Sequence, residues 1–251
     1  MSKFISKQSV AIWYALTALF ATFLVGQVIL FFFPDRSSLG ASLLFILMNL
    51  IPMIVAAVFS LVLSEVNSLG EFFKKVFLQK ESPLSWILAF FIPVIYYGIS
   101  ILLMNVRFTG NSLLAFFLYF PWTLLYGGLE EVGWRWFLQD HLSFSKHFIP
   151  KMMLLSIVWF LWHIPIYQLP WITAGSSNYL IFYLMILGNT FLFGALKEYS
   201  KGAVPCIIAH MLIDSLAVLM LVQSSLPQII FLVIFEILVS SWLVAIRKSE
   251  K

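Results

Sequence analysis

Seven charged or ionisable side chains lie inside stretches of sequence that are otherwise apolar, and six of them belong to short motifs. These six form three groups along the chain: Glu130, Glu131 and Arg135; His163; and His210 with Asp214. A charged side chain at the centre of a bilayer costs at least roughly 2.5–3.5 kcal/mol, so such residues are expected to face the protein interior and to have partners. Ionisable groups that converge from separate segments are what an active site or an ion pathway requires.

Glu131 and Arg135 are spaced i,i+4 and are expected to pair on one face of a helix. Glu130 lies about 100° around the same helix and cannot share that pairing equally. The Glu131 carboxylate is thereby neutralised by Arg135. The Glu130 carboxylate is left without this partner and could act as a general base. A structural ion pair with Glu130 at a water-filled rim is the alternative.

The histidines follow the same spacing rule. His210 and Asp214 lie i,i+4, and a carboxylate that accepts a hydrogen bond from an imidazole fixes its tautomer. His163 stands one helical turn after Trp159. A lone histidine in a membrane helix is often only a hydrogen-bond partner between helices, and that interpretation stays open for His163.

Two other polar residues in the apolar stretches are Cys206 and Glu236. Cys206 lies one turn before His210, which raises a Cys-His-Asp nucleophilic set. Neighbours on one rigid helix rarely aim at a common substrate atom, and a small buried cysteine is ordinary packing, so this set is disfavoured. Glu236 has no motif around it, and the sequence assigns it no function.

The segments that must position these residues are membrane helices. Of the 251 residues, 62% are hydrophobic and 10% are charged, and the mean hydropathy is +0.99. Soluble domains are about 45–50% apolar and about 25% charged, so an ordinary soluble protein and a disordered chain are both excluded. The net charge of +4 comes with no soluble module that could read nucleic acid.

We predict an all-α polytopic membrane protein, a single transmembrane domain over residues 1–251, with about eight helices of the roughly 20 residues that a bilayer requires. The predicted spans are 10–33, 39–63, 84–104, 112–138, 152–171, 179–196, 203–222 and 228–246. The connection 64–83 mixes phenylalanine with lysine. It fits either a short helix on the cytoplasmic membrane surface or a solvated loop with snorkelling lysines.

Lysine and arginine predict the orientation. With eight spans, Arg36 and Arg107 fall on one side of the membrane and twelve basic residues on the side of both termini. The twelve are Lys3, Lys7, Lys74, Lys75, Lys80, Lys146, Lys151, Lys197, Lys201, Arg247, Lys248 and Lys251. The positive-inside rule then predicts that both termini are cytoplasmic. The first apolar run is too long for a signal peptide and is expected to stay as a helix.

The same arrangement predicts where the ionisable residues lie. At 1.5 Å per residue, Glu130 is about 27 Å along the fourth span, His163 about 16 Å along the fifth and His210 about 10 Å along the seventh. Three spans thus bring two acids and two histidines to similar depth in the cytoplasmic half of the bilayer. We therefore predict a site in a cytoplasm-facing intramembrane cavity.

In order and spacing, the motifs resemble a known family. Glu130-Glu131-x-x-x-Arg135, an aromatic-x-x-x-His from Trp159 to His163, and His210-x-x-x-Asp214 are similar to the three motifs of the CPBP family. These are the CAAX prenyl proteases and bacteriocin-processing enzymes, also called the Abi family. The resemblance covers approximately residues 112–220. It implies about eight membrane helices and the activity of an intramembrane endopeptidase of the glutamate type.

The resemblance also implies a role for each residue. Glu130 would activate water as a general base, assisted by His163, while Glu131 and Arg135 would shape the site. His210 and Asp214 would support the tetrahedral oxyanion. Two positions depart from the family pattern. Trp159 replaces the usual Phe, which should matter little because both are bulky aromatics.

At position 214 many members have Asn instead of Asp. A carboxylate cannot donate a hydrogen bond to an oxyanion unless it is protonated. Asp214 is therefore expected to hold His210 in its donor form, leaving His210 as the donor.

No cofactor is expected. Zinc is the metal that the donor types would suit, with Glu130, His163, His210 and Asp214 as its ligands. The usual helical zinc motif, His-Glu-x-x-His, is missing, and we favour a metal-free mechanism.

Two other functions are weighed against a peptidase. One is a non-catalytic bacteriocin immunity protein or membrane scaffold of the same fold. The other, less favoured, is a proton-coupled transporter with Glu130, Glu131 and Glu236 as relays, for which no inverted repeat is visible.

The expected partners are a peptide or protein substrate in or at the membrane and the lipid bilayer, with no nucleic acid. The excess of lysine over arginine and the lack of a targeting extension favour a bacterial plasma membrane. A bacteriocin or other peptide would be a more natural substrate there than a prenylated C-terminus. The sequence indicates neither the substrate nor the oligomeric state.

Overall fold

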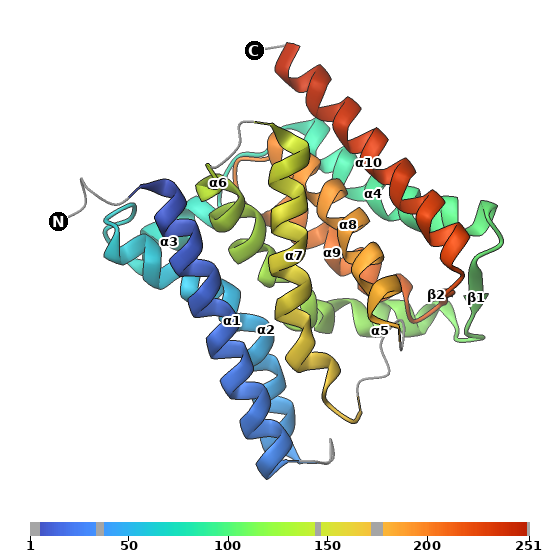
Figure 1. The fold of residues 1–251 in the computed structure, drawn as a ribbon, viewed down its shortest axis with the longest axis horizontal. Helices are drawn as coiled ribbons and strands as arrows, with labels where there is room; N and C mark the ends of the chain where they lie inside the picture. Colours follow the sequence, from blue (N-terminus) through green and yellow to red (C-terminus); the bar gives the residue numbers. More distant parts are fainter. Residues whose placement is uncertain (1–5, 34–37, 144–146, 172–177, 250–251) are drawn as a thin grey trace.

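The computed structural model describes residues 6–33, 38–143, 147–171 and 178–249 (Figure 1). Six of its helices are long and apolar enough to cross a membrane: α1 (Lys7–Phe32), α2 (Leu39–Val62), α4 (Pro83–Leu102), α7 (Phe148–Tyr167), α8 (Tyr179–Tyr199) and α10 (Leu226–Ser249). The all-α polytopic fold predicted from the sequence is confirmed, and the chain is an integral membrane protein.

The remaining elements are short. They are the helices α3 (Leu69–Phe77), α5 (Leu113–Thr123), α6 (Gln139–His141) and α9 (Val204–Leu216), the π-helical turns η1 (Leu124–Gly128) and η2 (Val132–Leu138), and the strands β1 (Val106–Phe108) and β2 (Met220–Val222). The predicted connection 64–83 contains α3, so a short helix is confirmed there, and its position on the cytoplasmic membrane surface stays a prediction. Its Phe72 and Val76 are buried against the protein.

Serine sets the start of four helices. The hydroxyls of Ser6, Ser38, Ser68 and Ser82 each accept a hydrogen bond from the backbone N–H three residues later, at 3.0 to 3.1 Å. Such caps satisfy one of the backbone donors that a helix start leaves without a partner. The polar residue before each apolar run therefore determines where the helix begins.

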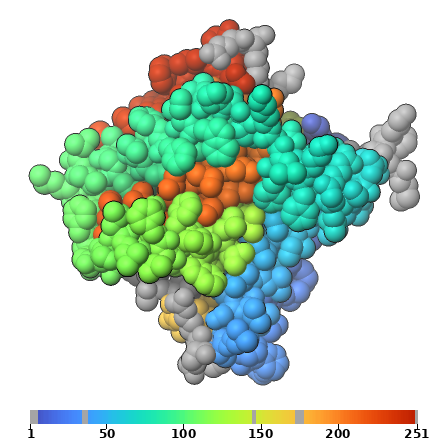
Figure 2. Space-filling model, turned by 180° about the vertical axis from the view of Figure 1, so that it is seen from behind, coloured from blue at the N-terminus to red at the C-terminus, as the bar shows by residue number. Residues whose placement is uncertain are grey.

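The predicted fourth span, 112–138, is bent. One part ends with η1 at Gly128, the next begins with η2 at Val132, and the axes differ by 46°. A Cβ at Gly127 would lie 3.0 Å from Nε2 of His210, so glycine lets α9 approach the bend closely. In Figure 1, α5 runs across the direction of α7, and Figure 2 shows part of α9 exposed between α4 and α5.

The predicted seventh span, 203–222, is not one helix. Helix α9 has 13 residues, which at 1.5 Å each is about 20 Å, short of the roughly 30 Å of a bilayer core. After α9 the chain forms β2, which pairs antiparallel with β1 and places Leu221 opposite Arg107. Within the described ranges there are six long helices, or seven spans with the bent pair, so the predicted count of eight is not confirmed.

Two opposite sides of the bundle can be distinguished. The terminal side holds the start of α1, α3, α6, the start of α7, the end of α8, the start of α9 and the end of α10. Side-chain contacts join it together: Ser143 donates its backbone N–H to Gln8, Lys197 pairs with Asp140, and Arg247 donates to the carbonyl of Glu198. The hairpin side holds β1 and β2. Figure 1 shows the start of α1 at the left, the end of α10 at the top and the hairpin at the right.

Helices α1 and α2 pack closely on the bent segment. The Tyr14 hydroxyl donates to the Pro52 carbonyl at 3.0 Å, and both residues occupy the space that a side chain at Gly133 would need. The Trp162 indole donates to Thr22 at 2.9 Å, which ties α7 to α1. The bend therefore rests on a rigid, buried support.

Candidate active site

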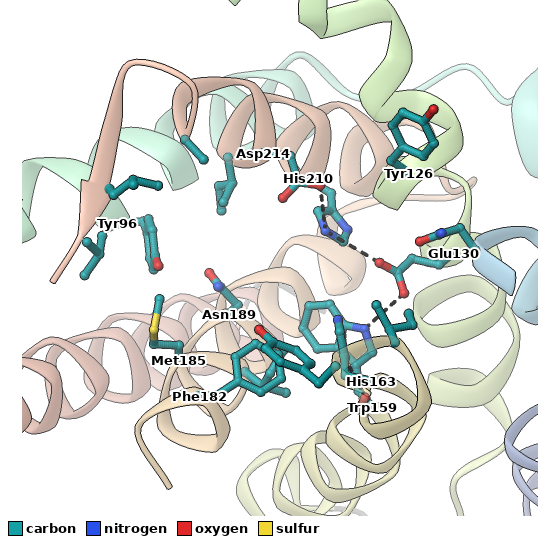
Figure 3. Close-up of a pocket in the computed structure, with 18 of the residues that line it drawn as sticks. Tyr96, Tyr126, Glu130, Trp159, His163, Phe182, Met185, Asn189, His210 and Asp214 are labelled. Carbon is teal, nitrogen blue, oxygen red and sulfur yellow. Dashed lines mark hydrogen bonds and ion pairs between the residues drawn. The ribbon is translucent and has the colours of Figure 1, made fainter. Parts of the chain in front are cut away.

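The six predicted site residues are brought together by three elements. The bend supplies Glu130, Glu131 and Arg135, α7 supplies His163, and α9 supplies His210 and Asp214. Four of them, Glu130, His163, His210 and Asp214, line one cavity of about 810 Å³ (Figure 3). This volume lies in the range of small-molecule sites. Glu131 and Arg135 lie behind the cavity wall and are completely buried.

The predicted ion pair between Glu131 and Arg135 is confirmed. Nε of Arg135 donates to Oε2 of Glu131 at 2.8 Å, and neither side chain is exposed. The guanidinium also lies over the rings of Trp159 and Phe193, with its central carbon 4.8 and 5.6 Å from their centroids. A planar guanidinium can pair and stack at once, which an ammonium cannot do as well.

Glu130 lies outside this pair, as predicted. Its Oε2 accepts hydrogen bonds from the indoles of Trp134 at 2.9 Å and Trp159 at 3.2 Å. Its Oε1 lies 3.6 Å from Nε2 of His210 (Figure 3). Two neutral donors thus fix the orientation of a carboxylate that is only 2% exposed and forms no pair with lysine or arginine among the described residues.

His210 is held by Glu131 rather than by Asp214. Its Nδ1 lies 2.8 Å from Oε1 of Glu131, so Nδ1 carries the hydrogen that this carboxylate accepts. Its Nε2 faces Glu130 and Asp214, each at 3.6 Å. The expectation that Asp214 fixes the tautomer is therefore corrected. Local spacing pointed to Asp214, whereas the actual partner lies 79 residues away in the sequence.

His163 enters the cavity from the other wall. Its Nδ1 donates to the backbone carbonyl of Trp159 at 2.8 Å, which leaves Nε2 as the acceptor of the neutral ring. Trp159 therefore contacts both His163 and Glu130. No hydrogen bond joins His163 directly to Glu130 within the described residues.

The sequence-based prediction did not include the two indole N–H groups that donate to Glu130, those of Trp134 and Trp159. Trp134 lies i,i+4 from Glu130, and this spacing could have identified it. Trp159 was expected to behave like phenylalanine, but phenylalanine has no N–H to donate to Glu130. The comparison by bulk alone overlooked this donor.

Cys206 and Glu236 do not line the cavity. Cys206 is buried, and its thiol lies 3.8 Å from the carbonyl of Phe193, so the nucleophilic set gains no support. Glu236 is buried where α10 meets Gly188 of α8. Neither of its carboxyl oxygens has a hydrogen-bond partner among the described residues.

The alternative metal set is not assembled. Within the described parts of the chain, no three His, Cys, Asp or Glu side chains are placed to hold a metal ion. Glu130, His163, His210 and Asp214 are thus not gathered around one point in this arrangement, and the metal-free mechanism stays a prediction.

The cavity runs from Glu130 to the hairpin side. Its walls there are Arg107 of β1, Tyr167 and Trp171 at the end of α7, and residues 221–224. None of the residues that join the terminal side lines it in the described structure. The cavity therefore extends toward the hairpin side, and the side of the membrane that it faces stays a prediction.

Comparison with known proteins gives one family match, to part of the chain. A sequence model described as type II CAAX prenyl endopeptidase Rce1-like matches residues 111–216. The match runs from α5 to the end of α9 and includes all six site residues. No curated protein matches the chain. The resemblance to CAAX proteases is confirmed over residues 111–216, which are similar to the Rce1-like family of type II CAAX prenyl endopeptidases.

Proposed function

We propose that this protein is an intramembrane endopeptidase in which Glu130 activates the water that hydrolyses a peptide bond. The observation that carries the proposal is the burial of Glu130 together with its hydrogen-bond partners. Glu130 is a buried carboxylate outside the Glu131–Arg135 pair, oriented by two indoles, with its second oxygen beside His210 at the cavity wall. A general base needs this combination of fixed direction and free acceptor capacity.

The reaction follows from the positions of the donors and acceptors. A water bound to Oε1 of Glu130 gives it a proton as the water oxygen bonds to the substrate carbonyl carbon. The carbonyl oxygen becomes an oxyanion, which a protonated His210 stabilises through Nε2, with Asp214 on the same side. The C–N bond then breaks, and the leaving amine takes the proton from Glu130. His163, on the opposite wall, assists the proton transfer through Nε2.

Glu131 and Arg135 act as positioning residues. Glu131 accepts from both Arg135 and His210, so it holds the imidazole with Nε2 toward the cavity. Such supporting contacts keep a site within the narrow geometry that catalysis demands. We place the protein in a bacterial plasma membrane, with a peptide or protein as substrate.

The test compares the wild type with Glu130→Gln at equal membrane levels. Glutamine preserves the shape of the side chain and an acceptor for the indoles but cannot take a proton, so hydrolysis should fall by about 10²–10⁴-fold. Mass spectrometry of peptide termini in the two membrane fractions reports natural substrates. A farnesylated CAAX peptide and the same peptide without the lipid are the defined probes for the purified protein.

Glu236→Gln is the matched control, because Glu236 is also a buried carboxyl in a membrane helix but lies outside the cavity. It should retain wild-type cleavage. Full hydrolysis by Glu130→Gln would remove Glu130 from the mechanism. Identical termini in both fractions, with both proteins folded, would favour the non-catalytic immunity or scaffold function instead.

A further inference from the structure

The basic residues of the molecule are gathered on one side. The described residues include eleven lysines and arginines, of which nine lie on the terminal side: Lys7, Lys74, Lys75, Lys80, Lys151, Lys197, Lys201, Arg247 and Lys248. Arg135 is buried in the site and Arg107 lies on the hairpin side. Lys3, Arg36, Lys146 and Lys251, which entered the count from the sequence, lie outside the described residues.

The uneven distribution of basic residues indicates how the protein is oriented in the membrane. Basic residues in short connections stay in the cytoplasm when a membrane protein inserts. Nine basic residues lie on the terminal side and one lies on the hairpin side. This ratio does not depend on the number of spans, because contacts between residues define the terminal side. The terminal side is therefore the cytoplasmic side.

The cavity is closed toward that side. Behind Glu130 lie Glu131, Trp134, Arg135 and Phe137, all completely buried. In the other direction, the walls continue past His163 and Asp214 to Arg107, Gln223 and Ser224 on the hairpin side. Gln223 and Ser224 are exposed, so the cavity reaches the surface there. Figure 3 shows the ionisable residues facing this space from α7, α9 and the bend.

We infer that the cavity opens on the non-cytoplasmic side and that its substrate is a peptide segment exposed on that side. The part of the inference that concerns a substrate rests on the proposed function, because only a peptidase has a peptide substrate. An opening on the non-cytoplasmic side distinguishes this protein from an enzyme that binds prenylated C-termini in the cytoplasm. A peptide or membrane protein segment that has crossed the bilayer is the class that can reach Glu130 without passing the buried residues behind it.

The walls fit a peptide with apolar or aromatic side chains. Aromatic rings line much of the cavity, among them Tyr96, Tyr97, Tyr119, Tyr126, Tyr167 and Phe182. Tyrosine combines a large apolar surface with a hydroxyl that can bond to a backbone. The cavity therefore offers a peptide both apolar contact and hydrogen-bonding groups.

The chain itself provides a clean test of sidedness. Cys206 is its single cysteine and is completely buried, so a cysteine introduced at the surface is the one that a soluble reagent meets. Ser224 and Ser249 are both exposed serines on opposite sides. Ser224→Cys and Ser249→Cys are thus a matched pair. Intact bacterial cells are treated with a membrane-impermeant maleimide before or after permeabilisation.

The expected result is labelling of Ser224→Cys in intact cells and of Ser249→Cys only after permeabilisation. The reverse pattern, or equal labelling of both, overturns the inference. This readout needs no enzymatic activity. If labelling is as expected but no termini depend on Glu130, the proposed function fails and the orientation stands.

A second arm joins orientation to cleavage. A bulky impermeant maleimide on Ser224→Cys should stop most cleavage in intact cells, relative to the same variant without label. Intact cells with Ser249→Cys, treated with the same maleimide, should lose no cleavage. The parent proteins of Glu130-dependent termini should carry the cut segment on the non-cytoplasmic side. Cut sites in cytoplasmic segments would overturn the inference even if cleavage is confirmed.

Discussion

Trp159 joins the parts of the site through one residue. Its indole N–H donates to Glu130, its ring covers the guanidinium of Arg135, and its carbonyl accepts from His163. Its ring also meets that of His210 edge-on, with centroids 5.8 Å apart. A substitution of Trp159 that keeps an aromatic ring but removes the N–H tests the hydrogen bond to Glu130 apart from the ring contacts.

Trp159→Phe keeps a ring beside Arg135 and removes the hydrogen bond to Glu130. A hydrogen bond to a charged group contributes about 1.5–3 kcal/mol, so kcat/KM should fall by roughly ten- to hundredfold. Steady-state cleavage of the best peptide substrate measures this change. Trp242→Phe, at a tryptophan exposed on α10, is the control. Equal rates for the two variants would show that the indole N–H has no role.

Glu131→Gln should act on stability more than Glu130→Gln does. A glutamine has one acceptor oxygen for two donors, and it leaves the buried Arg135 without its counter-charge. Removing one member of a buried pair costs about 3–5 kcal/mol. Thermal unfolding in detergent should therefore occur at clearly lower temperature for Glu131→Gln than for Glu130→Gln. Matching transitions would contradict the structural role of the pair.

At the scale of elements, the bend between η1 and η2 brings the acids to α9. Gly127 lies at the contact, where an added methyl group would overlap Asp214 and lie 3.0 Å from Nε2 of His210. Gly98 on α4 has no atom within 4 Å of the equivalent position. The two glycines thus form a test pair.

Gly127→Ala should displace His210 and lower cleavage by at least about tenfold, since a supporting shift near 1 Å can cost up to roughly a hundredfold. Gly98→Ala should retain activity and gain about 0.4–1 kcal/mol of stability, because alanine has less freedom to lose on folding. Cleavage rate and melting temperature are measured for both. Unchanged cleavage by Gly127→Ala would argue against the observed packing of α9 on the bend.

The sequence predicts contacts within one element better than contacts between elements. The Glu131–Arg135 pair follows from i,i+4 spacing, and Glu130 is left over by the same geometry. The bond between Glu131 and His210 depends on how the bend meets α9, which no local pattern contains. The end of α9 and the β1–β2 hairpin were missed because an apolar run looks the same in a buried strand and in a helix.

For the whole molecule, the family match covers less than the structure that supports the site. Residues 111–216 exclude α1, α2, α4 and α10. Yet Thr22 of α1 accepts from Trp162, Tyr14 and Pro52 pack on Gly133, and the Leu243 carbonyl of α10 accepts from Tyr199. The matched segment is therefore held by helices on both sides of it in the sequence.

A fragment of residues 111–216 should not fold alone in membranes. Its buried tryptophans and glycines would face lipid where α1 and α2 now pack, and their hydrogen-bond partners would be lost. Limited proteolysis of membranes that contain the fragment or the full chain compares them. We expect rapid cutting of the fragment and a resistant full chain. A fragment as resistant as the full chain would show that the matched segment is autonomous.

The i,i+4 arrangement of Glu131 and Arg135 also bears on biosynthesis. A bare arginine in a segment that leaves the translocon makes insertion unfavourable by about 2.5–3.5 kcal/mol. Here the counter-charge is four residues upstream on the same segment, so the arginine can be neutralised as soon as that turn forms. His210, the other partner of Glu131, is synthesised 79 residues later. The nascent chain thus inserts its most costly residue with a local partner, long before the distant partner emerges from the ribosome.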